Sequence, residues 1–234
     1  MGFLSGTRLK LGSRFKRSSI ASPARRSTDS TSRAFLQTEK CLLSKWLPSL
    51  VRVVGTHPFP LDELFAMAGA FEYHRPELVV DIGTHLGKSA RVWHEVAKWL
   101  GEPCQIHTVD LFDPNHPEFP GKLLGQFISG LPVAQHLGDG HTVAREILLA
   151  SPGKRVLLFL DGDHAYETVL RELQLATLLR PGASCILVHD TFYQPGASYN
   201  HGPYLAIEEY RKTFPFRQVV HLQLGLPGLS YLQV

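Results

Sequence analysis

The amino-acid sequence predicts a doubly wound α/β domain, with a mostly parallel sheet between helices and an antiparallel C-terminal strand. Short β-type runs alternate with helical segments through most of the chain, as in folds built from right-handed crossovers. Several of these runs are continuously apolar, as strands covered on both faces must be. The last two runs are joined by a turn too short for a crossover helix, so they are expected to form a hairpin.

Length and composition favour a single domain. The chain has 234 residues, of which 44% are hydrophobic, enough for one sizeable core. No run of about 18 uncharged apolar residues occurs, which excludes a membrane-spanning helix and predicts a soluble protein with no membrane partner. The three cysteines, Cys41, Cys104 and Cys185, lack C-x-x-C spacing. They suggest neither a disulfide framework nor a thiolate zinc site, and so favour a reducing, cytoplasmic compartment.

The N-terminal segment differs from the rest of the chain. Residues 1–34 contain eight serines and no acidic residue before Asp29, so they are expected to form a disordered basic leader. The same composition resembles an organelle transit peptide, which is the alternative to a merely solvated leader. Residues 1–40 carry a balance of +7 and the remainder carries −4. Because the part that can fold is mildly acidic, nucleic acid is not expected as a partner.

The elements follow in a regular order. Residues 35–76 are expected to form helices that pack on the core, with a turn at Gly55–Pro60 between them. Residues 77–234 are expected to form the main domain, with β-type runs at 77–83, 105–112, 134–139, 155–163 and 184–191. The segments RQVVHLQL and LSYLQV flank Gly225–Gly228 and are expected to form the antiparallel hairpin.

A glycine-containing loop follows the first predicted strand, in the segment VVDIGTHLGKS. A phosphate-binding P-loop needs one more residue between its glycines than Gly83 and Gly87 provide. A dinucleotide fingerprint needs further glycines where Thr84 and His85 stand, so NAD is disfavoured. The loop nevertheless allows a ligand to approach the backbone just before a helix begins.

Acidic residues follow each of the later predicted strands, namely Asp110, Asp139, Asp161 and Asp190. Ligands of open α/β sheets bind at this carboxyl edge. Gly162 can turn Asp161 and Asp163 toward one cleft, and Asp190 ends the neighbouring strand beside His189. Oxygen ligands from two strand ends can hold a hard divalent cation such as Mg²⁺. Two loops over this edge, residues 113–120 and 192–202, are candidates for contacting a substrate.

The glycine loop resembles motif I of S-adenosylmethionine-dependent class I methyltransferases, which implies a Rossmann-like methyltransferase fold and this cofactor. Carried over by position, the resemblance assigns cofactor contact to Asp81, Gly83, Thr84, Gly87 and Ser89. Asp110 would accept hydrogen bonds from the ribose hydroxyls, and Asp139 would accept one from the adenine amine. The antiparallel C-terminal strand is also typical of this superfamily.

The later motifs narrow the resemblance. The segments DGDHAYE, LRPG and HDT are similar to those of small O-methyltransferases grouped with cephalosporin-hydroxylase-like and sugar or macrolide O-methyltransferases, and the likeness covers roughly residues 77–191. Ala183 departs from the pattern at a turn that usually has a second glycine. The resemblance implies methyl transfer from S-adenosylmethionine to a hydroxyl of a small-molecule acceptor, with the help of a divalent cation as an option.

The same resemblance implies roles for the acids and histidines. Asp161, His189 and Asp190 would be the metal ligands, and Asp163 would be the base with His164 as the alternative base. Related metal-dependent enzymes often have a carboxylate in place of His189, and imidazole suits Mn²⁺ or Zn²⁺ better than Mg²⁺. In a purely structural interpretation, Asp163 or His164 caps the following helix.

Two other functions stay open at this point. A catalytically inactive binding module could keep the methyltransferase fold, and a hydroxylase or NAD-type oxidoreductase could share a similar fold. If the protein is a methyltransferase, we expect the carboxylates at the strand ends to converge on one site. The sequence leaves open which acceptor is used and whether the chain forms a homo-oligomer.

Overall fold

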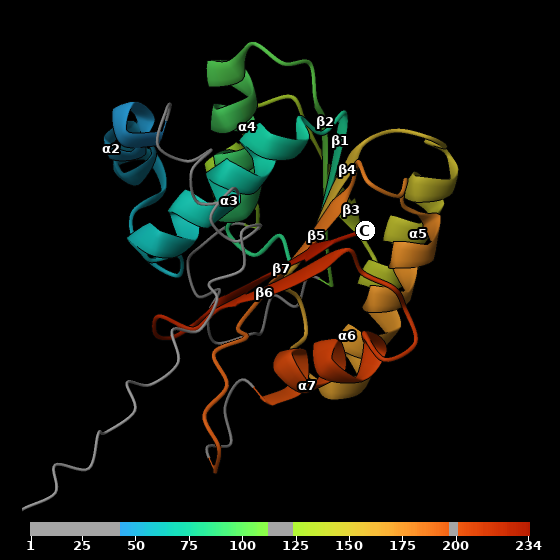
Figure 1. Cartoon of the computed structure of the whole chain (residues 1–234). Coiled ribbons are helices and arrows are strands. Elements are labelled where there is room, and N and C mark those ends of the chain that lie inside the picture. Colours follow the sequence, from blue (N-terminus) through green and yellow to red (C-terminus); the bar gives the residue numbers. More distant parts are fainter. Residues whose placement is uncertain (1–42, 112–123, 197–200) are drawn as a thin grey trace, which may run out of the picture.

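The structure, a computed structural model, describes residues 43–111, 124–196 and 201–234 (Figure 1). Its sheet has seven strands in the order β3-β2-β1-β4-β5-β7-β6. The strands are β1 (Leu78–Ile82), β2 (Gln105–Asp110), β3 (Val133–Leu137), β4 (Val156–Leu160), β5 (Cys185–His189), β6 (Gln218–Leu222) and β7 (Leu229–Gln233). All five predicted β-type runs and both arms of the predicted hairpin are therefore strands.

The strand directions confirm the predicted fold class. Strands β1 to β5 pair in parallel, and β7 is antiparallel both to β5 and to β6. The hairpin places β7, the last strand in sequence, between β5 and β6 in the sheet. The parallel strands all end at one edge, so the residues that follow β1, β2, β4 and β5 are brought close together.

Helices cover both faces of the sheet (Figure 1). One face is covered by α2 (Leu43–Val54), α3 (Leu61–His74) and α4 (Lys88–Leu100). The other face is covered by α5 (Gly140–Leu149), α6 (Tyr166–Leu173) and α7 (His201–Tyr210), and short 3-10 turns are η1 (Gln126–Ile128) and η2 (Gln174–Leu178). None of the helices in these three ranges is both long and apolar enough to cross a membrane.

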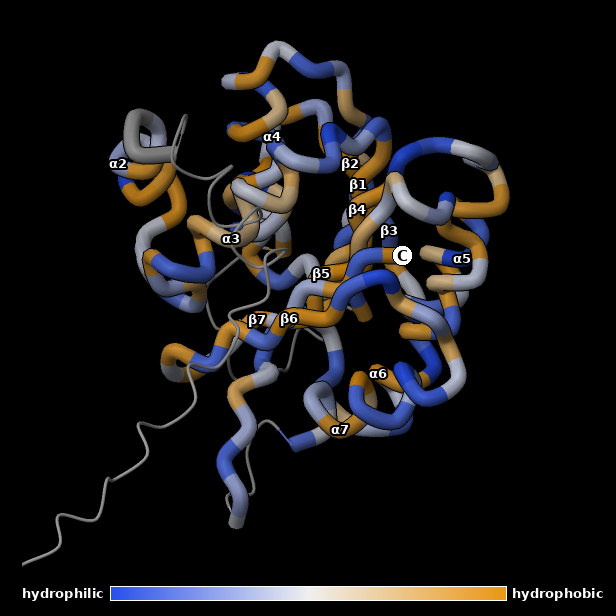
Figure 2. The backbone as a smooth tube through the Cα atoms, in the orientation of Figure 1, coloured by the Kyte–Doolittle hydropathy of each residue, from blue (hydrophilic) through white to orange (hydrophobic). Residues whose placement is uncertain are grey.

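Alternate residues of the central strands fill two separate cores. In β4, Leu157 and Phe159 pack against α3 and α4, whereas Val156, Leu158 and Leu160 pack against α5 and α6. All five residues are buried, which explains why the strand reads as a continuous apolar run. Figure 2 shows the apolar strands at the centre and more polar backbone in the surrounding helices.

The structure describes residues 43–76 of the segment that was expected to form the N-terminal helices. The predicted helical stretch that begins at Phe35 is seen as α2 from Leu43 onward, and the predicted leader, residues 1–34, lies outside the described residues. Helix α3 has Asp62 and Glu63 in its first turn, where acidic side chains complement the helix dipole. Most of its side chains are buried, so α3 is an integral part of the core.

Candidate active site

The glycine loop connects β1 to α4 and lies at the carboxyl edge of the sheet. Gly83 has a φ of 106°, and a methyl group there would overlap the backbone carbonyl of Asp161. Only glycine combines this backbone conformation with such a close approach. The cofactor loop predicted from the sequence is therefore packed directly against the end of β4, where the predicted metal ligands begin.

Asp81 lies in β1 and is fully buried. The indole Nε1 of Trp93 donates a hydrogen bond to its Oδ2 at 3.0 Å, whereas its buried Oδ1 has no hydrogen-bond partner among the described residues. Burial, with a smaller contribution from the carboxylates of Asp161 and Asp110, raises the pKa of Asp81 well above its usual value, although the side chains of Ser89 and Trp93 act in the opposite direction. A buried acid whose Oδ1 has no described partner at hydrogen-bond geometry is suited to a ligand that brings a donor or a positive charge.

The other predicted cofactor residues differ in what they still offer a ligand. The buried Thr84 hydroxyl lies 2.6 Å from the hydroxyl of Thr108, so it already has a hydrogen-bond partner in β2. Ser89 is buried in the first turn of α4, which begins after Gly87. Asp110 accepts a hydrogen bond from the backbone N–H of His85 at 2.6 Å, which ties the end of β2 to the glycine loop.

Asp139 has a structural role at the start of α5. Its Oδ1 accepts hydrogen bonds from the backbone N–H and the hydroxyl of Thr142, and its Oδ2 accepts one from Arg171 at 2.6 Å. The bonds from Thr142, together with Arg171, lower the pKa of Asp139 to about 2. Only Oδ2 has a lone pair left for the predicted adenine contact.

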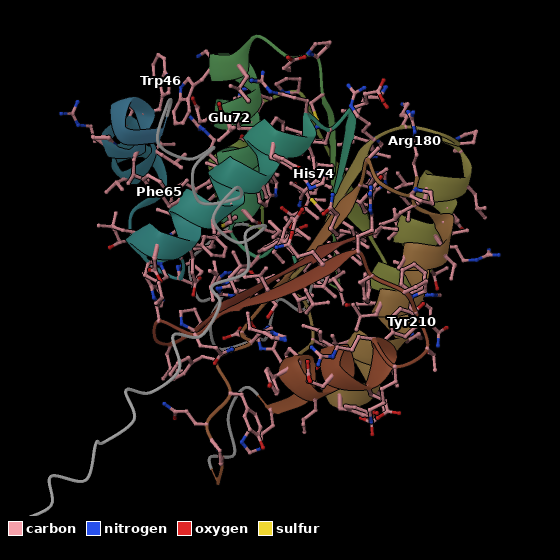
Figure 3. All side chains as sticks on the ribbon, in the orientation of Figure 1. Trp46, Phe65, Glu72, His74, Arg180 and Tyr210 are labelled. Atoms are coloured by element: carbon pink, nitrogen blue, oxygen red, sulfur yellow. The ribbon has the colours of Figure 1, made fainter. Side chains whose placement is uncertain are left out.

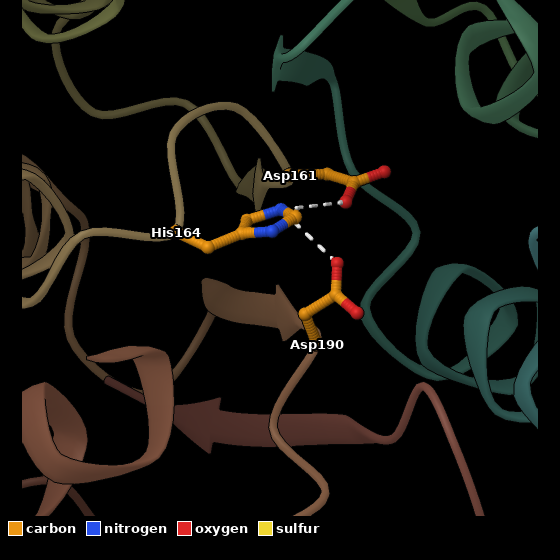
Figure 4. Close-up of side chains that lie close together, drawn as sticks. All are labelled: Asp161, His164 and Asp190. Carbon is orange, nitrogen blue, oxygen red and sulfur yellow. Dashed lines mark ion pairs between the residues drawn. The ribbon is translucent and has the colours of Figure 1, made fainter. Parts of the chain in front are cut away.

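Three side chains converge at the ends of β4 and β5 (Figure 4). The potential ligand atoms of Asp161, His164 and Asp190 all lie within 4.8 Å of one another, and we call these residues the triad. The Nε2 atom of His164 is 3.0 Å from Asp190 Oδ2 and 3.7 Å from Asp161 Oδ1. This buried nitrogen has no partner with hydrogen-bond geometry in the described part of the chain.

The backbone turns sharply at the triad. Asp190 has a φ of 56°, a conformation that non-glycine residues adopt rarely and that is common at functional sites. The start of α7 also approaches the triad closely, because a methyl group at Gly202 would overlap the backbone carbonyl of His164. The first turn of α7 is therefore packed directly against the loop that carries His164.

The charges of the triad stabilise one another. Although burial raises the pKa of Asp161, the rings of His189 and His164 outweigh it and lower this pKa below the usual value. Conversely, burial lowers the pKa of His164, but the carboxylates of Asp161 and Asp190 outweigh it and raise this pKa. Two acids and one imidazole that favour each other's charged forms can exchange a proton or hold a cation.

His189 is not part of the triad, although the sequence predicted it as a metal ligand. Its Nδ1 lies 2.8 Å from Asp161 Oδ1, and its Nε2 lies 2.9 Å from Oε2 of Glu63. Both ring nitrogens therefore already contact carboxylates. The geometry favours His164 in its place, because the Nε2 atom of His164 is directed at both strand-end acids.

Asp163, the predicted base, is bonded to the turn that precedes α6. It accepts hydrogen bonds from the backbone N–H of Ala165 at 3.0 Å and from the hydroxyl of Thr168 at 2.7 Å. The N-cap residue of α6 is Ala165, so Asp163 orders the turn before the helix and is not its cap. His164, the alternative base, is the residue that lies between the acids.

Glu63 is the site residue that the sequence analysis missed. It comes from α3, 126 residues before His189 in the chain, and its contact depends on the packing of α3 over the end of β5. The sequence holds one signal: Glu63 directly precedes the apolar segment LFAMAGAF, so it lies at the start of the helix face that packs on the core. Of the two predicted substrate loops, residues 113–120 lie outside the described residues, and residues 192–202 are described except for 197–200.

Comparisons with known proteins agree with this geometry. The profile of the rhamnosyl O-methyltransferase/CmcI family matches residues 59–221. The rhamnosyl O-methyltransferase of Mycobacterium tuberculosis is 30% identical over 151 residues, a match that covers 60% of this chain and 58% of that protein. The chain thus spans a little over half the length of this relative.

Solved structures share the fold. The O-methyltransferase from Bacillus cereus in complex with SAH is 15% identical, with 90% of this chain and 94% of that chain covered and a TM-score of 0.56. The mycinamycin pathway methyltransferase MycE, in complex with Mg, SAH and mycinamycin VI, is 14% identical, with 86% and 62% covered and a TM-score of 0.55. Because the family profile matches most of its length, this chain belongs to the rhamnosyl O-methyltransferase/CmcI family.

Proposed function

We propose that this protein transfers the methyl group of S-adenosylmethionine to a hydroxyl of a sugar carried by a small molecule. One observation carries the proposal: the triad of Asp161, His164 and Asp190 lies at the same edge of the sheet as the glycine loop, and Gly83 packs against Asp161. A methyl donor in the loop and an acceptor at the triad would be neighbours. Family membership and the names of the relatives support the sugar.

The donor end is proposed to lie along the glycine loop, with Asp81, Gly83, Thr84, Gly87 and Ser89 around it. The unused oxygen of Asp81 is available to a donor group of the cofactor. We propose that Asp110, at the end of β2, accepts hydrogen bonds from the ribose hydroxyls. The remaining lone pair of Asp139 would accept one from the adenine amine. Methyl transfer then depends on the acceptor oxygen lying in line with the sulfonium, which is a matter of positioning.

The triad is proposed to hold a divalent cation. Two carboxylates and an imidazole nitrogen without a hydrogen bond are a fitting donor set, and the imidazole favours Mn²⁺ or Zn²⁺ over Mg²⁺. When bound, such a cation lowers the pKa of a coordinated hydroxyl. In this arrangement Asp161, His164 and Asp190 are the ligands, and His189 supports Asp161.

A second version of the mechanism needs no cation. The Nε2 atom of His164 lies between two carboxylates, which stabilise the imidazolium that forms when His164 accepts the hydroxyl proton. The leaving proton would then reside on His164 while the methyl group bonds to the acceptor oxygen. This version is favoured by the raised pKa of His164.

The experiment uses S-adenosylmethionine with a labelled methyl group and a panel of rhamnosides and other glycosides. The protein is first treated with EDTA and then assayed alone, with Mn²⁺ and with Mg²⁺. We expect label on a sugar hydroxyl, and we expect Asp190→Asn to reduce transfer by at least about 100-fold with unchanged binding of S-adenosylmethionine. Calorimetry measures that binding.

The alternatives give different results. Binding of S-adenosylmethionine without transfer to any acceptor would support an inactive binding module. Binding of NAD(P) without binding of S-adenosylmethionine would support an oxidoreductase and end the proposal. If methyl transfer is unchanged after chelation, the reaction does not need a cation, and His164 remains as the base.

A further inference from the structure

Glu63 is a fully buried carboxylate that spans two elements at the carboxyl edge. Its exposed fraction is 1%, and both of its oxygens are used. Oε2 lies 2.9 Å from Nε2 of His189, and Oε1 accepts a hydrogen bond from the backbone N–H of Gly228 at 2.7 Å. A carboxylate taken out of water at this cost is stable only with such complete pairing.

His189 continues the connection from Glu63 to the triad. Its ring is 2% exposed and lies edge-on to Phe59, with the ring centroids 4.9 Å apart. Through Nδ1 it contacts Asp161 Oδ1 at 2.8 Å, the same oxygen that lies 3.7 Å from His164. The three side chains thus form a continuous line from α3, through the end of β5, to the end of β4.

We propose that Glu63 is a positioning residue that acts through His189 to fix the orientation of the Asp161 carboxylate in the triad. The torsion that turns an imidazole ring is broad and roughly two-fold, so the ring could rotate if only one nitrogen were bonded. With both nitrogens bonded, the ring is fixed and presents Nδ1 to Asp161. Supporting residues of this kind orient ligands that would otherwise adopt several rotamers. The inference rests on the proposed function of the triad.

The competing explanation is that Glu63 only pins the β6–β7 hairpin through Gly228. Glu63→Gln separates the two explanations, because its amide oxygen can still accept from the Gly228 N–H while the carboxylate facing His189 is lost. His74→Gln is the matched control. His74 is a buried residue at the other end of the same helix, and its Nε2 lies 2.7 Å from the Tyr231 hydroxyl, remote from the triad.

The first measurement needs neither cation nor substrate. Nitrogen-15-detected NMR of labelled histidine reports the ring nitrogens of His189, assigned by their loss in His189→Asn. We expect the Nδ1 signal, which reports the contact with Asp161, to shift or broaden in Glu63→Gln and to stay unchanged in His74→Gln. An unchanged Nδ1 signal in folded Glu63→Gln overturns the inference.

The second measurement asks whether the orientation matters. Binding of Mn²⁺ alone to the EDTA-treated protein is measured by electron paramagnetic resonance, together with kcat and KM for methyl transfer. We expect Glu63→Gln to weaken Mn²⁺ binding about 10-fold or more and to lower kcat, with KM for S-adenosylmethionine unchanged. His74→Gln should change neither quantity.

The outcomes separate this inference from the proposed function. Unchanged Mn²⁺ affinity and kcat in Glu63→Gln overturn the inference even if the wild-type protein is an active enzyme. If the wild-type protein neither binds Mn²⁺ nor transfers methyl groups, the proposed function fails, and the NMR signal alone decides whether Glu63 orients the ring beside Asp161. A loss of folding in Glu63→Gln, measured by circular dichroism, would show that the pairing of Glu63 with His189 serves the fold as a whole, and it would count against the inference.

Discussion

Asp81 and Asp161 lie close to the carboxyl ends of two neighbouring strands, yet their surroundings shift their pKa values in opposite directions. Asp81 lies in β1 and Asp161 directly follows β4, and the two strands pair in register at Ile82 and Leu160. Burial raises the pKa of both acids. Beside Asp81 the nearby ionisable groups are other carboxylates, so its pKa rises further, whereas His189 and His164 bring the pKa of Asp161 below its usual value.

The two buried histidines of α3 and β5 show the same contrast. His74, labelled in Figure 3, is the last residue of α3. It contacts the Tyr231 hydroxyl and the Ala183 carbonyl, which are neutral, and burial lowers its pKa to about 4. Burial also lowers the pKa of His189, but the carboxylates around it raise this pKa well above the usual value. The charge of a buried group is thus decided by its partners.

The largest expected effect is a difference between two matched substitutions. Asp161→Asn removes the carboxylate that pairs with buried His189, and we expect it to lower the free energy of unfolding at pH 8 by about 4 kcal/mol. Asp81→Asn replaces an acid whose neutral form is favoured by burial, and we expect it to cost much less stability than Asp161→Asn. Urea unfolding of both variants without cofactor makes the comparison. Equal losses would show that burial alone governs both acids.

A smaller effect is expected at Glu172, a third buried acid. Burial raises its pKa to about 8, and its Oε2 has no hydrogen-bond partner in the described part of the chain. The folded protein therefore binds a proton that the unfolded chain has released, so stability falls as the pH rises from about 4.5 to 8.

We expect Glu172→Gln to flatten this pH dependence. At pH 8 its free energy of unfolding should exceed that of the wild-type protein by about 2 kcal/mol, less than the full shift because the new amide also lacks a partner. Near pH 4.5, where the wild-type protein carries no penalty for an ionised Glu172, the amide without a partner should make the variant about 2 kcal/mol less stable than the wild type. Thermal unfolding across this range is the test, and parallel curves would contradict the assignment of a neutral Glu172.

The smallest effect is expected at Asp163, an exposed acid that sharpens the contrast with Asp161. Asp163→Ala removes the hydrogen bonds to Ala165 and Thr168 at the start of α6, which should cost about 1 kcal/mol of stability. Methyl transfer should stay within about twofold of wild type in the assay with labelled cofactor. A folded Asp163→Ala protein that has lost activity would restore Asp163 as the base.

Much of the fold could be predicted because the relevant signals are local. Continuous apolar runs identified β4 and β5, since both faces of these strands are covered. The short turn before Leu229 predicted the hairpin. The position of β7 between β5 and β6 could not be read from the sequence, because local patterns do not state which strands pair across a distance.

The sequence predicted which residues gather at the site better than it predicted which contacts they make. The strand-end acids Asp161 and Asp190 do meet, as parallel strands that end at one edge require. The predicted roles of Asp163, His164 and His189 stay predictions, but the structure places His164 between Asp161 and Asp190 and gives Asp163 and His189 other contacts. A sequence pattern contains these residues but does not say which side chain bonds to the neighbouring turn and which one lies between the strand-end acids.

The sequence by itself determined the order of strands and helices, and it determined that acids stand where the parallel strands end, because hydrophobic periodicity and turn chemistry are local properties. Only the tertiary structure decided that Glu63 reaches His189 from α3, that His164 lies between Asp161 and Asp190, and that Asp81 is left among other acids. These contacts join segments far apart in the chain, and their electrostatics depend on burial and partners that exist only after folding.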